Sequence, residues 1–325
     1  MQLIRRNRIL RQSPAIRAMV AETTLAPGDF IAPLFVDEGA GVKTPIASMP
    51  GYYRMSRDLI ITEVKELWDL GIRSVLLFIK CSDDLKDNTG QEAWNENGLM
   101  QTSIKAIKDA VPEMLVMTDV ALDPYSSYGH DGIVENEIIV NDPTVEALVR
   151  MSISHAEAGA DFVAPSDMMD GRIMAIRQGL EENNFTRTGI MAYSAKYASC
   201  FYGPFRDALD SAPGFGDKKT YQMDFANRRE AIRETLMDVE EGADIVMVKP
   251  ALSYLDIIRE IKDQVDVPVS AYQVSGEYAM IKAAAQMGWL NEDKAVLETL
   301  TSIKRAGADL IATYFAKPAV QLLNA

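Results

Sequence analysis

The sequence predicts a (β/α)₈ barrel, and two observations carry this prediction. One phrase recurs along the chain, in which a helix-like run ends in a glycine and an apolar strand follows shortly after. Its copies are ELWDLGIRSVLLFIK, HAEAGADFVAPS, VEEGADIVMVKP and IKRAGADLIATYF. In addition, eight apolar strands alternate with helix-like segments over most of the chain, which is the order expected of a closed parallel barrel.

Each copy of the phrase has a physical reason for its glycine and its apolar run. The residue that follows a helix commonly adopts a left-handed conformation, which glycine tolerates best. An uninterrupted apolar run indicates a parallel strand that is buried on both faces. The glycines are Gly71, Gly159, Gly242 and Gly307, and the expected strands span 31–36, 74–80, 115–122, 162–167, 189–196, 245–250, 269–275 and 310–315.

Taken in order, the strands differ in what ends them. IAPLFV and SVLLFIK are apolar throughout most of their length, whereas LVMTDVAL and FVAPSD contain aspartate near their ends. GIMAYSAK and IVMVKP run into lysine, and VSAYQVS and LIATYF carry serine or tyrosine. Helical periodicity fills most of the gaps, as in 226–242, where Ile232, Leu236 and Val239 share one face.

An open doubly wound sheet is the alternative architecture for alternating strands and helices. No GxGxxG or GxxxxGKS/T motif follows any strand. The absence of these motifs disfavours the nucleotide-binding version of that fold.

Composition limits the classes of function. The chain has 325 residues and a net charge of −14, which argues against broad binding to nucleic acid or anionic membranes but not against a local basic pocket. The two cysteines, Cys81 and Cys200, give no sign of a disulfide and suit a reducing cytoplasm. No apolar run approaches the roughly 18 residues of a membrane span.

Residues 1–25 are expected to form an N-terminal arm, followed by a catalytic barrel over 26–325. Arginines interrupt every apolar run of the arm, so it does not resemble a secretory signal. A transit peptide is the alternative to an arm that is ordered or bound to a partner subunit.

Chemistry in such a barrel lies at the C-terminal ends of the strands. These ends are unusually polar for strands that are buried. The polar residues there are Lys80, Asp119, Asp123, Ser166, Asp167, Lys196, Lys249, Ser275 and Tyr314.

Lys196 and Lys249 end the fifth and sixth strands, and adjacent strands lie about 4.8 Å apart. Mutual repulsion and partial burial would each lower the pKa of a lysine, which produces a nucleophilic amine. Such an amine can attack a carbonyl group and form a Schiff base. The alternative is that each lysine simply pairs with an aspartate at the barrel mouth.

The segment around 199–224 is long and rich in glycine and proline, as active-site lids often are. It carries Arg206, Lys218 and Lys219. A basic lid above paired lysines indicates an anionic substrate, and a carboxylate suits it best. The alternative is a solvated surface loop with scattered charges.

Four motifs, MAYSAKYASCFYGPFRDA, MVKPALSYLD, YQVSGEYAM and TYFAK, resemble the porphobilinogen synthase family, also called 5-aminolevulinate dehydratases. The likeness runs from RRNRILRQSPAIRAMV to the C-terminus. The resemblance implies a (β/α)₈ barrel and a hydro-lyase that condenses two 5-aminolevulinate molecules to porphobilinogen with loss of two waters. This reaction is an early step of tetrapyrrole (heme and chlorophyll) biosynthesis.

The resemblance also implies roles in two substrate sites. Lys249 would form a Schiff base in the first-bound site, the P site, where Ser275 and Tyr314 would hold the substrate carboxylate. Lys196 would do the same, or assist, in the second site, the A site. For the A site it further implies Arg206 and Lys218 on the carboxylate, Gln222 nearby, Asp119 in proton transfer or amine binding, and Ser166 in the lining.

Zinc is not expected in this active site. Where zinc-using members of the family carry three cysteines, this chain has Ala121, Asp123 and Asp131, so a thiolate site is absent. Carboxylates suit Mg²⁺ or direct contact with a substrate amine. His130 beside them is a ligand, an outer-shell group or an exposed loop residue.

The resemblance implies that the chain is of the magnesium-responsive type. Glu234, on the helix before the Lys249 strand, matches the glutamate that organises a hydrated, allosteric Mg²⁺ in such relatives. Judged by the sequence alone, Glu234 is an ordinary exposed helix residue. The resemblance also implies that the arm wraps a neighbouring subunit and that dimers assemble into a homo-octamer, with a hexamer or dimer as alternatives.

Two other functions are alternatives to a dehydratase. A class I aldolase shares the barrel and the amine nucleophile, but the basic lid and the paired lysines favour two carboxylate-bearing substrates. A catalytically silent barrel that binds or assembles would be expected to lack a lysine or the lid cations.

Overall fold

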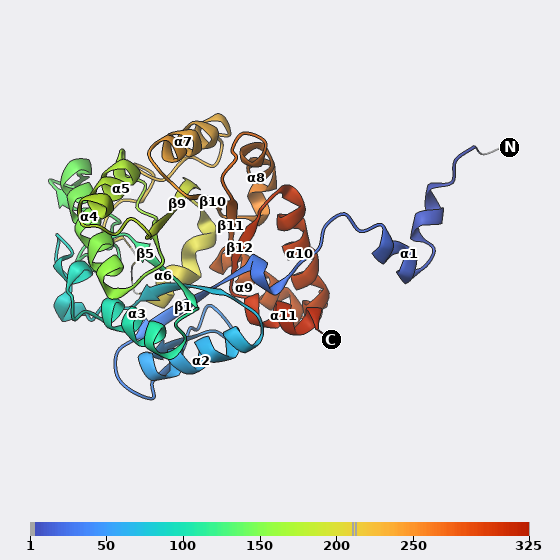
Figure 1. Cartoon of the computed structure of the whole chain (residues 1–325), viewed down its shortest axis with the longest axis horizontal. Helices are drawn as coiled ribbons and strands as arrows, with labels where there is room; N and C mark the ends of the chain where they lie inside the picture. Colours follow the sequence, from blue (N-terminus) through green and yellow to red (C-terminus); the bar gives the residue numbers. More distant parts are fainter. Residues whose placement is uncertain (1–3, 210, 212, 325) are drawn as a thin grey trace.

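Eight parallel strands form a closed barrel in the computed structural model, which describes residues 4–209, 211 and 213–324. Strand β12 pairs with β1 and closes the sheet, and helices surround it (Figure 1). The barrel strands are β1 (Phe30–Asp37), β4 (Ser74–Ile79), β5 (Leu115–Val120), β8 (Phe162–Pro165), β9 (Gly189–Lys196), β10 (Ile245–Lys249), β11 (Val269–Gln273) and β12 (Leu310–Thr313).

The predicted fold is therefore confirmed, with most strands slightly shorter at their C-terminal ends than expected. Apolar side chains continue into the loops that build the barrel mouth, so composition alone overestimates strand length there. The main helices are α2 (Arg57–Asp69), α3 (Leu99–Ala110), α4 (Asn141–Ala158), α5 (Arg172–Glu182), α7 (Arg229–Glu240), α8 (Leu255–Lys262), α9 (Ser275–Gln286), α10 (Glu292–Ala306) and α11 (Ala316–Leu323).

Smaller elements decorate the barrel. A hairpin of β2 (Lys43–Pro45) and β3 (Tyr53–Ser56) extends the sheet beside β1, and β6 (Val134–Glu135) pairs with β7 (Ile138–Ile139). Helix α6 (Gly203–Leu209) lies in the predicted lid. The remaining short helices are α1 (Pro14–Met19), η1 (Asn7–Arg11), η2 (Pro27–Asp29), η3 (Asp83–Leu85), η4 (Gln91–Trp94), η5 (Cys200–Tyr202) and η6 (Leu252–Tyr254).

The recurring phrase has a structural reason beyond its glycine. In three copies the glycine is followed by Ala-Asp, and the carboxylates of Asp161, Asp244 and Asp309 each accept an N–H from the preceding barrel strand at 2.8 Å. The backbone N–H of each aspartate in turn donates to the carbonyl of the strand residue whose N–H its carboxylate accepts. These aspartate clamps (Asp161, Asp244 and Asp309) join neighbouring strands at the N-terminal face of the barrel.

Helix α7 forms as predicted, but the apolar residues of its shared face are not its most buried ones. Leu236 is 38% exposed, while Ile232 and Val239 are half-buried. The helix instead buries Ala231, Thr235 and Asp238. Asp238 turns inward because its Oδ1 lies 2.9 Å from Nη1 of buried Arg172 on α5. A buried ion pair, which apolar periodicity does not reveal, therefore selects the inner face of this helix.

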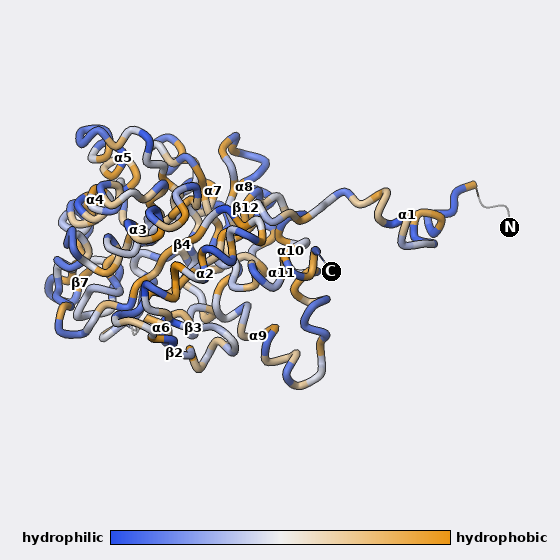
Figure 2. The backbone as a smooth tube through the Cα atoms, turned by 60° about the horizontal axis from the view of Figure 1, so that its bottom comes forward, coloured by the Kyte–Doolittle hydropathy of each residue, from blue (hydrophilic) through white to orange (hydrophobic). Residues whose placement is uncertain are grey.

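The N-terminal arm extends away from the barrel (Figure 1). Its helix α1 buries no residue, and Ile9, Leu10 and Met19 are all exposed. Figure 2 shows apolar segments concentrated in the barrel, with hydrophilic segments in the outer loops. No helix in the described part of the chain has the length and apolar character needed to cross a membrane.

Candidate active site

The two lysines singled out in the sequence lie side by side at the barrel mouth. Lys196 is the last residue of β9, Lys249 is the last residue of β10, and the two are partners in the strand register. Each is 5% exposed. Burial of an ammonium group is costly unless it is paired or loses its charge, and the two lysines meet this cost in different ways.

Lys249 is surrounded by aromatic rings. Its Nζ has no carboxylate within ion-pair distance among the described residues. Four ring centroids lie 4.8 to 5.1 Å from it, namely those of Tyr193, Tyr202, Phe205 and Tyr272. Burial, and then the charge of Lys196, lower the pKa of Lys249 to about 7. A large fraction of this amine is therefore neutral, and nucleophilic, near neutral pH.

We expect the rate of adduct formation at Lys249 to follow this pKa. The neutral amine is the nucleophile, so the rate should rise through pH about 7, level off above it, and fall about tenfold per unit below it. The measurement is the initial rate of cyanoborohydride-trapped adduct with a simple keto acid across the pH range. Lys196→Met should move the midpoint upward because it removes the neighbouring charge. A wild-type midpoint near 10, as for an exposed lysine, would contradict the assignment.

Lys196 is instead paired. Its Nζ lies 2.9 Å from Asp131 Oδ2 and also donates to the Ser166 carbonyl. Lys218 contacts the other oxygen of Asp131 and lies 3.3 Å from Asp123 Oδ2. Burial alone would raise the pKa of Asp131, but the two lysines outweigh it and hold the pKa below the usual range. Asp123 and Asp131 therefore bind lysines here.

Asp119 on β5 has the properties of a proton-transfer group. It is 5% exposed, and burial together with the charge of Asp123 raises its pKa to about 7. A carboxyl group with this pKa exchanges protons readily at neutral pH. The positive charges of Lys196 and Lys249 lower this pKa, so Asp119 interacts electrostatically with both lysines.

Ser275 and Tyr314 lie beside Lys249 at the barrel mouth. Both residues and Lys249 line a small closed cavity that is too tight to admit a water molecule in this structure. The Ser275 hydroxyl accepts from the Phe205 N–H at 2.9 Å, and the Tyr314 and Tyr272 hydroxyls are 2.9 Å apart. Phe205 belongs to α6, so the predicted lid closes over Lys249 in this structure.

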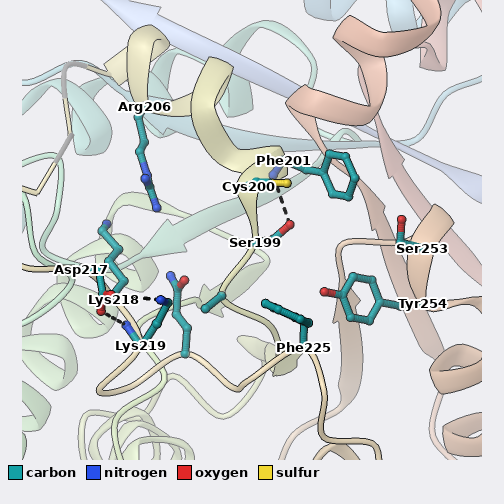
Figure 3. A pocket seen from close by; sticks show the side chains of 12 residues that line it. Ser199, Cys200, Phe201, Arg206, Asp217, Lys218, Lys219, Phe225, Ser253 and Tyr254 are labelled. Atoms are coloured by element: carbon teal, nitrogen blue, oxygen red, sulfur yellow. Dashed lines mark hydrogen bonds and ion pairs between the residues drawn. The ribbon is translucent and has the colours of Figure 1, made fainter.

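The lid cations line a second and larger cavity, of about 640 Å³ (Figure 3). Arg206 extends from α6 toward the side where Lys218 lies. Gln222 lines the same cavity. The Oε1 atom of Gln222 is buried and has no hydrogen-bond partner among the described residues, so it is available as an acceptor. Neither Lys196 nor Lys249 lines this cavity. Residues 210 and 212 of the predicted lid lie outside the described residues.

Two expectations about individual residues are wrong. His130 is not exposed: its side chain is fully buried, and its two ring nitrogens lie 3.1 Å from the Tyr221 hydroxyl and the Phe215 carbonyl. It therefore anchors the lid segment. Glu234 is not fully exposed either, because its side chain is 28% exposed on α7. Burial raises its pKa, and Arg172 opposes that rise.

The sequence analysis missed the aromatic surroundings of Lys249. Tyr193, Tyr202, Phe205 and Tyr272 all lie within two of the quoted motifs, MAYSAKYASCFYGPFRDA and YQVSGEYAM. Aromatic residues are common in ordinary cores, so their type alone carried no functional signal. The closed barrel, which brings β9, β10, β11 and the lid together, reveals their position.

The fold and the site define a class of protein: a barrel enzyme with an amine nucleophile and a cationic pocket beside it. The chain belongs to the delta-aminolevulinic acid dehydratase family, whose model matches residues 4–322.

Relatives match over nearly the whole chain. A chloroplastic delta-aminolevulinic acid dehydratase of Physcomitrium patens is 58% identical over 97% of this chain and 73% of its own length. The protein of that name from Synechococcus elongatus is 55% identical over 98% of both chains. The crystal structure of the Toxoplasma gondii enzyme in complex with the reaction product porphobilinogen has a TM-score of 0.96 and 51% identity, and the match covers 98% of this chain and 91% of that one.

Proposed function

We propose that this chain is a hydro-lyase that condenses two 5-aminolevulinate molecules to porphobilinogen and two waters, an early step of tetrapyrrole biosynthesis. Membership of the dehydratase family supports this reaction. The observation that carries the mechanism is the register pairing of Lys196 with Lys249 at the barrel mouth. Two adjacent amines suit a reaction that joins two ketone-bearing substrates.

In the proposed P site, the neutral amine of Lys249 attacks the ketone carbon of the first substrate. The carbinolamine then loses water, and a C=N bond replaces the C=O bond. Ser275 and Tyr314 line the same small cavity and supply hydroxyl donors for the substrate carboxylate. The four surrounding rings exclude water from the Schiff base.

In the proposed A site, the second substrate lies between Lys196 and the cations of the lid. Arg206 and Lys218 would bind its carboxylate, with Gln222 as a further polar contact. Lys196 forms or assists a second Schiff base, Ser166 lines the site, and Asp119 moves a proton at or near the amine. Asp123 and Asp131 would position Lys218 and Lys196 through their ion pairs.

Reductive trapping tests the proposed function. The protein is incubated with 5-aminolevulinate, reduced with borohydride and digested, and the modified peptide is identified by mass spectrometry. We expect an adduct on Lys249, with or without a second on Lys196, and porphobilinogen in the unreduced sample. Folded, magnesium-replete protein that gives no adduct on either lysine would point instead to a silent barrel.

We also propose that the chain is of the magnesium-responsive type. No group of three or more His, Cys, Asp or Glu side chains within the described residues is arranged to hold a metal ion. A hydrated Mg²⁺ needs only one carboxylate anchor, however, and Glu234 is a half-buried carboxylate with Asp238 nearby in its electrostatic surroundings. When bound, Mg²⁺ would supply charge and order to α7 away from the lysines.

Glu234→Gln tests the magnesium proposal. We expect Mg²⁺ to increase both the activity and the melting temperature of the wild-type protein, and we expect both responses to be lost in the variant. Adduct formation at Lys249 without Mg²⁺ should be the same in both proteins. A Mg²⁺ response of the variant that matches the wild type would remove Glu234 from this role.

Assembly and location remain proposals. Leu25, at the end of the arm, packs against the barrel core, whereas Ile9, Leu10 and Met19 are exposed; these exposed apolar side chains support a homo-octamer built from dimers through the arm. The two described cysteines are both free, which supports a cytoplasmic location. Several plant relatives carry the word chloroplastic in their names.

A further inference from the structure

Glu277 is a fully buried carboxylate at the place where the loop after β10, the start of α9 and the lid segment meet. It lies in the first turn of α9, two residues after Ser275, and its exposure is 0%. Its Oε1 accepts the Leu252 N–H at 2.7 Å, and its Oε2 accepts the Val274 N–H at 2.8 Å. The N–H of Ala251 lies 3.5 Å from Oε2.

These donors come from the two segments that carry the proposed P site. Ala251 and Leu252 follow Lys249 in the chain, with only Pro250 between, while Val274 directly precedes Ser275. One carboxylate therefore fixes the end of β10 relative to the start of α9. These two segments carry the groups that would contact opposite ends of a P-site substrate, namely the amine of Lys249 and the hydroxyl of Ser275.

The lid rests on the same turn of α9. The Ser275 hydroxyl accepts the Phe205 N–H at 2.9 Å and donates to the Phe201 carbonyl at 3.4 Å. A Cβ on Gly276 would lie 2.5 Å from that carbonyl oxygen, so only glycine allows the lid backbone to approach this closely. Any movement of this turn would thus displace the hydroxyl and the lid together.

We infer that Glu277 is a positioning residue for the P site, which sets the distance between the Schiff-base amine of Lys249 and the carboxylate-binding hydroxyl of Ser275. This inference rests on the proposed function. Glu277 touches neither substrate nor lysine, and it acts through the backbone N–H groups that it binds. Hydrogen bonds to a charged acceptor are stronger than neutral ones, and a glutamine side chain provides only one acceptor oxygen for these donors.

The test compares two ketones that differ only in the carboxylate, namely 4-oxopentanoate and its neutral methyl ester. Each is trapped on Lys249 with cyanoborohydride, and the ratio of the two rates measures how well the carboxylate is held in line with the amine. We expect the wild-type ratio to be large, and we expect Glu277→Gln to lower it by roughly tenfold or more. A purely structural role would reduce both rates by the same factor and leave the ratio unchanged.

Two further variants serve as controls. Ser275→Ala should also lower the ratio, because it removes the hydroxyl itself. Asp244→Asn neutralises a comparable carboxylate, which accepts a backbone N–H at the opposite end of the barrel, and should leave the ratio unchanged. If Glu277→Gln does not fold, Glu277→Asp, which keeps the charge but is one methylene shorter, is measured in the same way and is also expected to lower the ratio.

The outcomes separate this inference from the proposed function. A wild-type ratio well above one that persists in the folded Glu277 variant overturns the positioning role and leaves the function standing. A wild-type protein that forms no adduct with the keto acid overturns the proposed function and the positioning role together. A lowered ratio in the variant, with Asp244→Asn unchanged, supports both.

Discussion

Lys249→Ala should abolish porphobilinogen formation, with turnover reduced by at least about a thousandfold, because the covalent route is lost with the amine. The fold should survive. Within the described part of the chain, Lys249 has no ion-pair partner whose charge would be left uncompensated, and its neighbours are aromatic rings. The measurements are the steady-state rate with 5-aminolevulinate and the far-ultraviolet circular dichroism of the variant.

Lys249→Met provides the matched control for stability. It keeps most of the side-chain volume and removes the buried amine, so we expect its free energy of unfolding in urea to equal or exceed that of the wild type. Turnover should be as low as in the alanine variant. Near-normal activity in either folded variant would disprove a Schiff base at this position.

Asp131→Asn is the second change with a large expected effect. The carboxylate of Asp131 is shared by two buried lysines, Lys196 and Lys218. Removal of one partner from a buried ion pair typically lowers the free energy of unfolding by about 3 to 5 kcal/mol. We expect a loss of this size in urea, together with a large fall in kcat/KM, because the amine of Lys196 and the lid cation lose the group that positions them.

The pH dependence of this loss has a definite sign. The pKa of Asp131 is lower in the folded protein than in the unfolded chain, so its contribution is fully present above the unfolded pKa of about 4. It is lost as pH falls through the folded pKa. The stability difference between wild type and variant should thus be constant at neutral pH and shrink only in acid.

Asp123→Asn is the control for Asp131. Asp123 lies 3.3 Å from Lys218 and has no described ion pair with Lys196. We expect a smaller loss of stability and of kcat/KM than for Asp131→Asn. Equal losses in the two variants would show that the lysines respond to the total negative charge at this position rather than to the particular carboxylate between them.

The parts of the fold that repeat were predictable from the sequence. The Gly-Ala-Asp phrase marks the same event each time, since its glycine ends a helix and its aspartate joins the next strand to the previous one. The positions of Lys196 and Lys249 followed from strand order, because barrel closure brings neighbouring strand ends together. The predicted C-terminal ends of the strands were less accurate, because apolar residues continue from the strands into the loops of the barrel mouth.

Features that depend on long-range partners were not predictable in this way. The buried face of α7 is chosen by Arg172, which is distant in sequence from Asp238. His130 becomes buried only because the lid segment with Phe215 and Tyr221 folds over it. Glu277 looks like an ordinary first-turn glutamate in YQVSGEYAM, where it accepts only the local N–H of Val274; the loop after β10 adds the N–H groups of Ala251 and Leu252.

The aspartate clamps bear on how this barrel could be redesigned. They lie at the N-terminal ends of the strands, whereas the lysines, the lid and the aromatic rings lie at the C-terminal ends. Strand alignment is therefore maintained from the face opposite the chemistry. In a directed-evolution library, residues around Lys249 can be randomised to accept other carbonyl compounds while the aspartate clamps are kept unchanged. Most variants should then still fold, so that selection compares their activities rather than their stabilities.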